Sequence, residues 1–305
     1  MISFLLKRFA WMALTLWAVF TVSFWLMWLV PGGPLDSERA VDPVIQKNLE
    51  KRFHLDRPLT EIYFSELTRT LTGDLGYSYR RRDFTVNEII ASGWPYSAAL
   101  GLSALILAIT FGLAIGIISA VFRGSFADVA LRSVATIGIA LPNFVIAGLM
   151  VLLFVIYWPI FPAARLLSPW HLILPAICLA APYAAYIARL VRTGMLDVLS
   201  QDYIRTARAK GLPARRVILR HALRGALLPV VSYLGPAIAG LLTGSLVIEQ
   251  IFAIPGLGMH FVQAATQRDY TLAMGLVLLY TTLLYSMNLL VDVSYRWLDP
   301  RVKLE

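Results

Sequence analysis

The sequence predicts an all-α membrane protein with six transmembrane helices. Of its 305 residues, 58% are hydrophobic and 15% are charged, whereas a soluble domain usually has about 45–50% apolar and about 25% charged residues. A helix needs roughly 20 apolar residues to cross a bilayer, and a spanning segment must satisfy its own backbone hydrogen bonds. Six longer runs without a charged side chain meet this requirement: 9–35, 89–122, 133–164, 166–188, 225–248 and 270–291.

These runs divide the chain into a membrane core and two peripheral parts. The first run is too long for a secretory signal and has no small-x-small cleavage site, so it predicts an uncleaved first span. The expected parts are a cytoplasmic N-terminus with transmembrane helix 1 at 1–30, an external segment at 31–94, a core of helices 2 to 6 at 95–299 with a basic cytoplasmic loop at 193–225, and a cytoplasmic tail at 300–305.

The net charge of +9 is distributed in a way that indicates membrane orientation and not nucleic-acid binding. Nine basic and two acidic residues lie in 189–224, whereas the links 158–170 and 250–269 have one basic residue each. Basic residues concentrate in short cytoplasmic loops, while long loops translocate largely regardless of charge. The bias therefore predicts that both termini and 189–224 are cytoplasmic, and that the long segment 31–94 is external.

Short helices are expected in the external segment. The cluster Pro31-Gly32-Gly33-Pro34 ends the first run. Asp42-Pro43 and Pro58 are typical helix starts, and Gly73 is a typical helix end. Residues 85–88, Thr-Val-Asn-Glu, have the form of a capping box at the start of the second span.

The sequence has no recognisable set of catalytic groups. It has no phosphate-binding loop, no His-Glu-x-x-His and no Gly-x-Ser-x-Gly. Its four histidines are far apart in sequence, so we predict no catalytic residue, no cofactor and no metal site in this chain. Ion-coupled transporters often carry charged residues inside the membrane, but here Glu249 and Asp292 lie only at the ends of the runs. Energy for any transport is therefore expected to come from outside this chain.

The stretch after the fourth run reads as two short helices with a break between them. Ser200 can cap the first helix, Gly211 can end it in a left-handed conformation, and Pro213 can start the second. Tyr203 and Ala207 fall on one face of the first helix. Two interpretations are open: a solvated basic loop, or a surface of small and aromatic side chains that docks into a groove of another protein.

Glycine pairs with a spacing of four residues occur in two of the predicted spans. Gly112 and Gly116 form one pair, and Gly240 and Gly244 form the other. This spacing lets two helix backbones approach closely. It fits either tight static packing or a seam along which helices move during translocation.

The sequence resembles the permease subunits of binding-protein-dependent ABC importers, in the dipeptide, oligopeptide and nickel subgroup. The resemblance covers nearly the whole chain and is strongest at 202–212, Asp-Tyr-Ile-Arg-Thr-Ala-Arg-Ala-Lys-Gly-Leu. Gly225 departs from the subgroup, which usually has Asn there, and Arg205-Thr206 replace the Glu-Ala of the wider family. Further matching segments are 85–86, 88–90, 141–142, 144, 221–223, 227–229, 249, 252, 255–258, 268–269, 288–292 and 298–301.

The resemblance implies an ABC importer permease fold in the inner membrane of a bacterium. The implied assembly has a sister permease subunit, two cytoplasmic ATP-binding subunits and an extracytoplasmic solute-binding protein. This chain would then be a multi-pass, pore-forming subunit in the lipid bilayer, and not an enzyme. Di- or oligopeptides are the favoured solute, with nickel or another small solute, or a non-transporting membrane scaffold, as alternatives.

The resemblance also implies three groups of functional residues. The ATPase-coupling group is Asp202, Tyr203, Thr206, Ala207, Lys210, Gly211 and His221. The candidates for an external gate or docking face are Glu249, Pro255, Gly256 and Gly258, the alternatives being a simple turn and a local pairing of Glu249 with Arg268. The candidates for the translocation path are Pro142, Asn143, Gly240, Thr243 and Gly244.

The predicted topology can be tested by labelling with a membrane-impermeant thiol reagent. A cysteine at Ser37 should react from outside intact cells, and a cysteine at Ser200 only after the membrane is opened, because 31–94 and 189–224 are predicted on opposite sides. Reaction of both cysteines from outside would contradict the predicted orientation.

Overall fold

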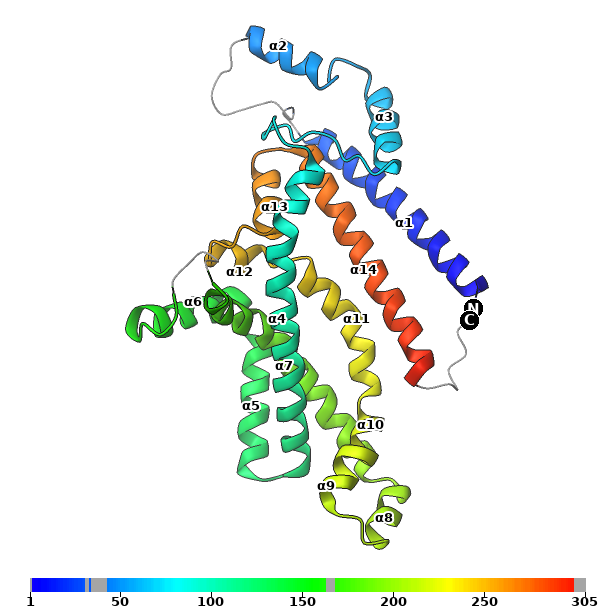
Figure 1. Cartoon of the computed structure of the whole chain (residues 1–305), viewed down its shortest axis with the longest axis vertical. Coiled ribbons are helices and arrows are strands. Elements are labelled where there is room, and N and C mark those ends of the chain that lie inside the picture. Colours follow the sequence, from blue (N-terminus) through cyan, green and yellow to red (C-terminus); the bar gives the residue numbers. More distant parts are fainter. Residues whose placement is uncertain (1, 31–32, 34–42, 163–167, 299–305) are drawn as a thin grey trace. The chain divides into compact units, whose positions relative to one another are not determined.

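The computed structural model describes residues 2–30, 33, 43–162 and 168–298, which form helices and turns (Figure 1). Within these ranges the one extended pairing is an isolated β-bridge between Tyr77 and Thr85. The chain forms two compact units, one of residues 1–96 with 255–285 and the other of 97–254 with 286–305. Two long helices, α4 (Val86–Val121) and α14 (Tyr270–Leu298), contribute to both units.

An aromatic cluster holds the first unit together. Phe20 and Phe24 of α1 (Ile2–Leu29) are buried against Tyr63 of α3 (Leu59–Leu71), with ring centroids 5.6 and 5.3 Å from the tyrosine ring. Met274 and Leu278 of α14 belong to the same cluster. Offset and edge-to-face ring pairs add stabilisation beyond that of the apolar area they bury. The cluster therefore fixes α3 on α1 and α14. Two shorter helices, α2 (Pro43–Arg52) and α13 (Leu257–Thr266), complete the unit.

The predicted helix starts are confirmed where the structure describes them. Helix α2 begins at Pro43, while Asp42 and all of the 31–34 cluster except Gly33 lie outside the described residues. Pro58 is the N-cap of α3, and Gly73 follows the C-cap with a φ of 83°. These signals are local, so they operate independently of the surrounding fold.

The capping box before α4 is also confirmed. Glu88 Oε2 accepts a hydrogen bond from the backbone N–H of Thr85 at 2.8 Å, and Thr85 Oγ1 accepts one from the backbone N–H of Glu88 at 3.2 Å. The pair satisfies two backbone donors that a helix start would otherwise leave free. It fixes the residue at which the chain enters α4.

Asp269, immediately before α14, is the polar centre of the first unit. Its carboxylate is buried and accepts five hydrogen bonds, three of them from the segment that precedes α4. The donors are the hydroxyl of Ser78, the backbone N–H groups of Tyr79 and Arg80, the hydroxyl of Thr271 and the backbone N–H of Leu272. Asp269 thus caps α14 and ties a distant segment to its first turn.

The second unit packs the rest of α4 and α5 (Phe126–Ala140) around α7 (Trp170–Leu199). The Gly112 and Gly116 pair lies where α4 meets α7. A Cβ at Gly116 would be 2.7 Å from the carbonyl oxygen of Ala188, and one at Gly112 would be 2.9 Å from that of Ala184. Only glycine allows this approach, so the pair is a packing contact.

The third predicted span is not a straight helix, which corrects the sequence prediction. Helix α5 ends at Ala140. The next segment, α6 (Asn143–Val151) continued by the π-helical turn η1 (Leu152–Tyr157), is bent by 108° relative to α5. The cause is Pro142, which disfavours a helical conformation for the residue before it and has no N–H to donate. Leu141 is accordingly extended, with a ψ of 130°.

The number of apolar spans agrees with the prediction when this bent pair counts as one. Five other helices in the described residues are long and apolar enough to cross a membrane. The fourth run was predicted to end at Ala188, but α7 continues to Leu199. Arg189 and Arg192 therefore lie on the same continuous helix as the apolar part of the run.

Removal of the Asp269 carboxylate should destabilise the first unit strongly. Asp269→Ala leaves several buried donors without an acceptor, at a cost of about 1–3 kcal/mol for each donor that water cannot reach. Asp269→Asn should be milder, because its amide oxygen can still accept and the Ser78 hydroxyl can reverse its direction. Thermal unfolding of the purified protein in detergent, followed by tryptophan fluorescence, measures the difference. Equal midpoints for wild type and Asp269→Ala would contradict this role.

Candidate functional site

The loop between α7 and α11 (Leu228–Leu242) is a compact element anchored on α7. It consists of α8 (Asp202–Ala209), α9 (Ala214–Arg216), the π-helical η2 (Val217–Ala222) and α10 (Leu223–Ala226). Ile204, Val217, Ala222 and Ala226 are all at most 1% exposed and share one apolar cluster with α7. We call these four helices the α8–α10 element.

Gly194 of α7 and Ala226 of α10 make a close backbone contact between this element and α7. A Cβ at Gly194 would be 2.9 Å from the carbonyl oxygen and 3.0 Å from the Cα of Ala226. Side chains of any size would push the two backbones apart. Because protein interiors are close-packed and transmit strain, a displacement of α10 also displaces the end of α7.

The predicted coupling residues divide into an outer and an inner set. Four of them, Asp202, Tyr203, Thr206 and Lys210, are exposed on the outer surface of α8 or at its end. Ala207 is only 7% exposed and packs inward beside Ile204. This corrects the expectation that Ala207 and Tyr203 form one accessible patch: the aromatic ring is accessible and the alanine is part of the anchor.

Gly211 ends α8 as the sequence predicts. Its φ is 74°, and the backbone N–H of Leu212 donates to the carbonyl of Ala207 at 3.3 Å. No atom lies within 4 Å of the position a Cβ would take, so space does not require glycine there; the backbone conformation does. The prediction that Ser200 caps α8 is wrong: Gln201 holds that position, and the Ser200 hydroxyl donates to the carbonyl of Asp197 at 2.7 Å.

The second half of the element is predominantly basic. Pro213 precedes α9, as predicted for the start of the second helix. Arg216, Arg220 and Arg224 are exposed, and His221 is half-buried. The α8–α10 element therefore presents an exposed tyrosine and several cations on a rigid base.

A second site of interest is the break between α11 and α12 (Leu246–Ile251). Glu249 is fully buried and accepts a hydrogen bond from the Ser97 hydroxyl of α4 at 2.8 Å. Gly244 has a φ of 86° and lies against the Glu249 carboxylate, where a Cβ would collide with it. Gly244 is thus a break in the helix and not, as the spacing with Gly240 suggested, part of a packing pair.

The other candidates for the gate lie in the first unit, at the start of α13. Gly256 is the N-cap of α13, and Gly258 is buried in its first turn, with Pro255 just before it. His260 is buried in the next turn. Burial lowers the pKa of His260, and the positive charge of Arg81 lowers it further.

The path candidates mark the two helix breaks of the second unit. Pro142 and Asn143 lie at the bend between α5 and α6, and Thr243 caps the end of α11. Gly240 faces α7, where a Cβ would be 3.1 Å from the Tyr183 hydroxyl. The structure brings Gly240 next to an aromatic group that the sequence analysis did not select.

That aromatic group is a line of tyrosines between α7 and α11. The ring of Tyr233 on α11 is 4.4 Å from that of Tyr186 and 6.5 Å from that of Tyr183, both on α7. The guanidinium of Arg189 is 4.8 Å from the centre of the Tyr186 ring. We call Tyr183, Tyr186 and Tyr233 the tyrosine seam. The signal in the sequence is Tyr183 and Tyr186 at a spacing of three, one turn before Arg189.

A buried ion cluster at the α4–α5 turn was also missed. Asp128 is 1% exposed, and its two oxygens accept from Arg192 at 2.9 and 3.0 Å. Ser119 and the backbone N–H of Gly124 donate to the same carboxylate, and Arg132 lies 3.3 Å away. A buried carboxylate needs such partners. The cluster joins the adjacent ends of α4, α5 and α7.

Comparison with known proteins agrees with this architecture. Residues 112–304 match the family described as binding-protein-dependent transport system inner membrane component. The dipeptide transport system permease protein DppB of Bacillus subtilis (strain 168) is 45% identical over 304 residues, covering 100% of this chain and 99% of that protein. The oligopeptide transport system permease protein OppB of Escherichia coli (strain K12) is 42% identical over 309 residues, covering 99% and 100%.

The fold is shared with a solved transporter of lower sequence similarity. A chain of the inward-facing MetNI methionine ABC transporter aligns with a TM-score of 0.58 and 19% identity, over 69% of this chain and 96% of that one. At this level of identity the likeness concerns the fold.

Proposed function

The chain belongs to the family of binding-protein-dependent transport system inner membrane components, and we propose that it is the permease subunit through which an ATP-driven importer moves dipeptides or oligopeptides. Two relatives of full length, at 45% and 42% identity, are named for dipeptide and oligopeptide transport. The peptide-transporting members of the family are therefore the basis for the proposed substrate.

The proposal rests on the arrangement of the α8–α10 element, which is anchored on one side and exposed on the other. Its outer residues are exposed and polar or aromatic, while Ile204 and Ala207 anchor α8 to the cluster that includes α7. A helix held rigidly from one side and accessible from the other is suited to dock into a groove of a second protein. We assign this groove to a cytoplasmic ATP-binding subunit, whose movement would be transmitted to α7.

The orientation of the chain follows from the same assignment. The α8–α10 element and both termini lie in the cytoplasm, and 43–85 lies outside, as the distribution of basic residues supports. Two ATP-binding subunits and a sister permease complete the membrane assembly. A path between the two permeases would run along the tyrosine seam and the helix breaks at Pro142 and Gly244.

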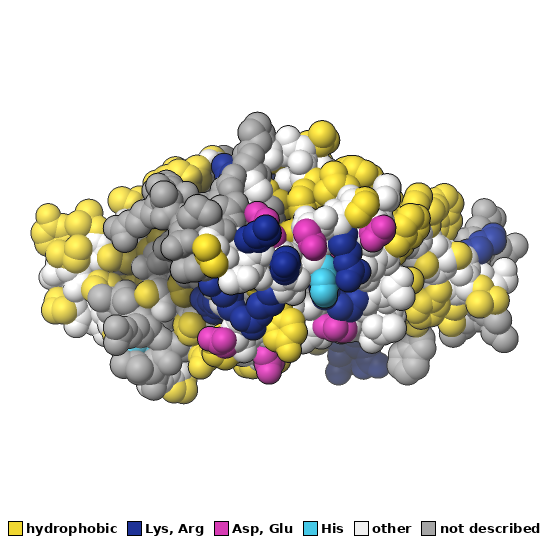
Figure 2. All heavy atoms as spheres, turned by 90° about the horizontal axis from the view of Figure 1, so that it is seen from above, with side chains coloured by type: hydrophobic (Ala, Val, Ile, Leu, Met, Phe, Trp, Pro, Cys, Tyr) yellow, Lys and Arg dark blue, Asp and Glu magenta, His cyan; other side chains and the backbone are white. Residues whose placement is uncertain are grey.

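The α2–α3 end is proposed as the docking face for a solute-binding protein. Seen from above, basic and acidic side chains are interspersed in one group (Figure 2). A cavity of about 240 Å³ there is lined by Arg52, Arg57 and Arg69 together with His54 and Glu66. Interspersed charge of this kind sets orientation and association rate at a transient interface. The cavity suits an acidic side chain of the partner.

The chain purified alone is expected to hydrolyse no ATP, because its sequence has no phosphate-binding loop. Hydrolysis should be measured by phosphate release in detergent, with the complete transporter as the positive control. Activity that stays with this chain after the ATP-binding subunits are removed would contradict the proposal.

Gly211→Asp should abolish coupling without unfolding the protein. Asp, like Asn, tolerates the left-handed backbone at a φ of 74°, so the change that matters is the negative charge that aspartate adds beside the docking helix. The expected result in proteoliposomes containing the complete transporter is at least about a tenfold loss of ATP-dependent dipeptide uptake, with normal membrane levels.

Two variants separate the possible causes of that loss. Gly211→Asn has the same shape without the charge, and Asn tolerates a left-handed conformation, so it should retain most of the uptake. Gly124→Asn places the same side chain at a similar φ of 79° in the α4–α5 turn, outside the docking element. Wild-type uptake by Gly211→Asp at equal expression would exclude this element as the coupling site. Ala207→Trp is unsuitable as a test, because Ala207 is buried in the anchor.

A further inference from the structure

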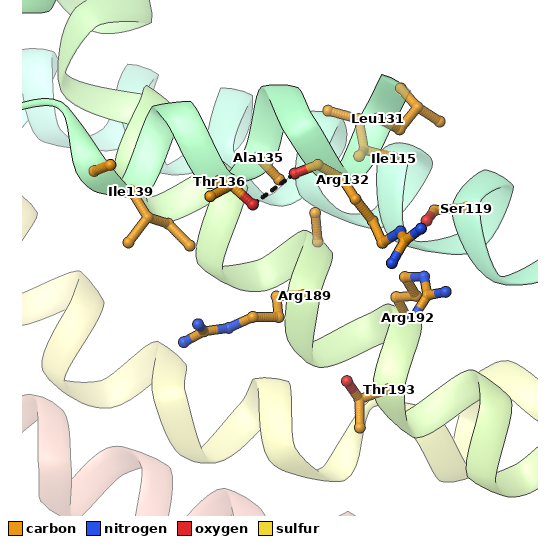
Figure 3. Close-up of a pocket in the computed structure, with 12 residues that line it drawn as sticks. Ile115, Ser119, Leu131, Arg132, Ala135, Thr136, Ile139, Arg189, Arg192 and Thr193 are labelled. Atoms are coloured by element: carbon orange, nitrogen blue, oxygen red, sulfur yellow. Dashed lines mark hydrogen bonds between the residues drawn. The ribbon is translucent and has the colours of Figure 1, made fainter. Parts of the chain in front are cut away.

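A cavity of about 270 Å³ lies among α4, α5 and α7 in the second unit. Most of its wall is apolar, and the charged groups on it are all basic. Figure 3 shows the labelled side chains of α5 and α7 on either side of it. The residues that matter for its chemistry are the apolar Ile115, Leu131 and Ile139 and the basic Arg132, Arg189 and Arg192.

The three arginines are not equivalent. Asp128 binds Arg192 through two hydrogen bonds and lies 3.3 Å from Arg132. No ion pair among the described residues involves Arg189, whose recorded contact is with the face of the Tyr186 ring at 4.8 Å. The interaction of a cation with a tyrosine ring is much less stabilising than its pairing with a carboxylate in a desolvated site. Arg189 is therefore the arginine of this cavity that can take an anionic ligand.

Arg189 is exposed in this chain and lies toward the C-terminal end of α7. From Trp170, the first residue of α7, to Arg189 is nineteen residues, or about 28 Å of helix, so Arg189 lies near the inner edge of the hydrocarbon core. Helix side chains lean toward the N-terminus, and Figure 3 shows Arg189 pointing away from Arg192 and from the labelled side chains of α5. An arginine facing lipid would instead turn toward the headgroups.

We propose that Arg189 binds the free C-terminal carboxylate of the transported peptide, with the last side chain of the peptide in the apolar part of the cavity; this rests on the proposed peptide-importing function. A guanidinium donates two parallel hydrogen bonds to a carboxylate. The carboxylate is common to dipeptides and oligopeptides of any sequence. The tyrosine seam beside Arg189 supplies hydroxyl groups for the peptide backbone.

Photo-crosslinking in the complete transporter tests the location. Proteoliposomes that contain this chain, the sister permease, the ATP-binding subunits and the solute-binding protein are loaded with a dipeptide that carries a diazirine on its C-terminal side chain. After illumination during turnover, mass spectrometry should find the dipeptide on the residues of α5 and α7 that line the cavity.

Variants test the role of the charge. Arg189→Gln should lower the cross-linked fraction at least about tenfold, since hydrogen bonds to a charged group are lost, and Arg189→Lys should give an intermediate value. The matched control is Arg123→Gln, which removes the same charge from an exposed residue at the end of α4, outside the cavity. The control should cross-link as the wild type does.

The outcomes distinguish this proposal from the function on which it rests. If the wild type takes up the dipeptide but cross-links it elsewhere, or if Arg189→Gln cross-links as strongly as the wild type, the carboxylate site is wrong and the importer stands. A photoreactive phosphatidylglycerol that labels the cavity when the peptide does not would make it a lipid site and also overturn the proposal. If the wild type shows no ATP-dependent peptide uptake, both proposals fail.

Discussion

The contact between Gly194 of α7 and Ala226 of α10 is the constraint on which the proposed mechanism depends. It holds the α8–α10 element against the end of a 30-residue helix, with no side chain between the two backbones to absorb movement. The buried residues around it, from Ile204 to Val217, belong to one cluster with α7. A force applied to α8 therefore reaches α7 as a displacement of a rigid body, because close-packed interiors shift between discrete arrangements and do not deform smoothly.

Two breaks in the helices, at Pro142 and Gly244, provide points at which the second unit can bend. A bilayer gives no partners to free backbone groups, so non-helical backbone at membrane depth is tolerated where protein buries it or where it lines a cavity. The turn at Gly244 meets this condition in the second unit, where the fully buried Glu249 lies against it, whereas Pro142 at the other bend is exposed in this chain. Breaks at these positions allow α5 and α11 to change direction without breaking the packing of Gly112 and Gly116 on α7.

Sequence reasoning succeeded where the signal was local. The capping box at Thr85, the left-handed end of α8 at Gly211 and the positions of the apolar helices each depend on a few neighbouring residues. It failed where residues far apart in the chain meet: Asp269 with Ser78, Asp128 with Arg192, and Tyr186 with Tyr233. Ala207 shows the same limit, since its spacing from Tyr203 gave the correct helix but could not tell which side the protein's own core would cover.

One helix carries both the proposed ligand group and the proposed coupling contact. Arg189 and Gly194 are five residues apart on α7, about 7.5 Å along its axis. The ends of α4 and α5 join α7 through Asp128, so they follow it, whereas Tyr233 is on α11, beyond the α8–α10 element. A movement of that element would therefore change the distance between Tyr233 and the α7 side of the tyrosine seam. Coupling free energies are reciprocal. If nucleotide bound to the partner subunits changes the affinity of the Arg189 site for peptide by some factor, a peptide bound there must change the affinity for nucleotide by the same factor.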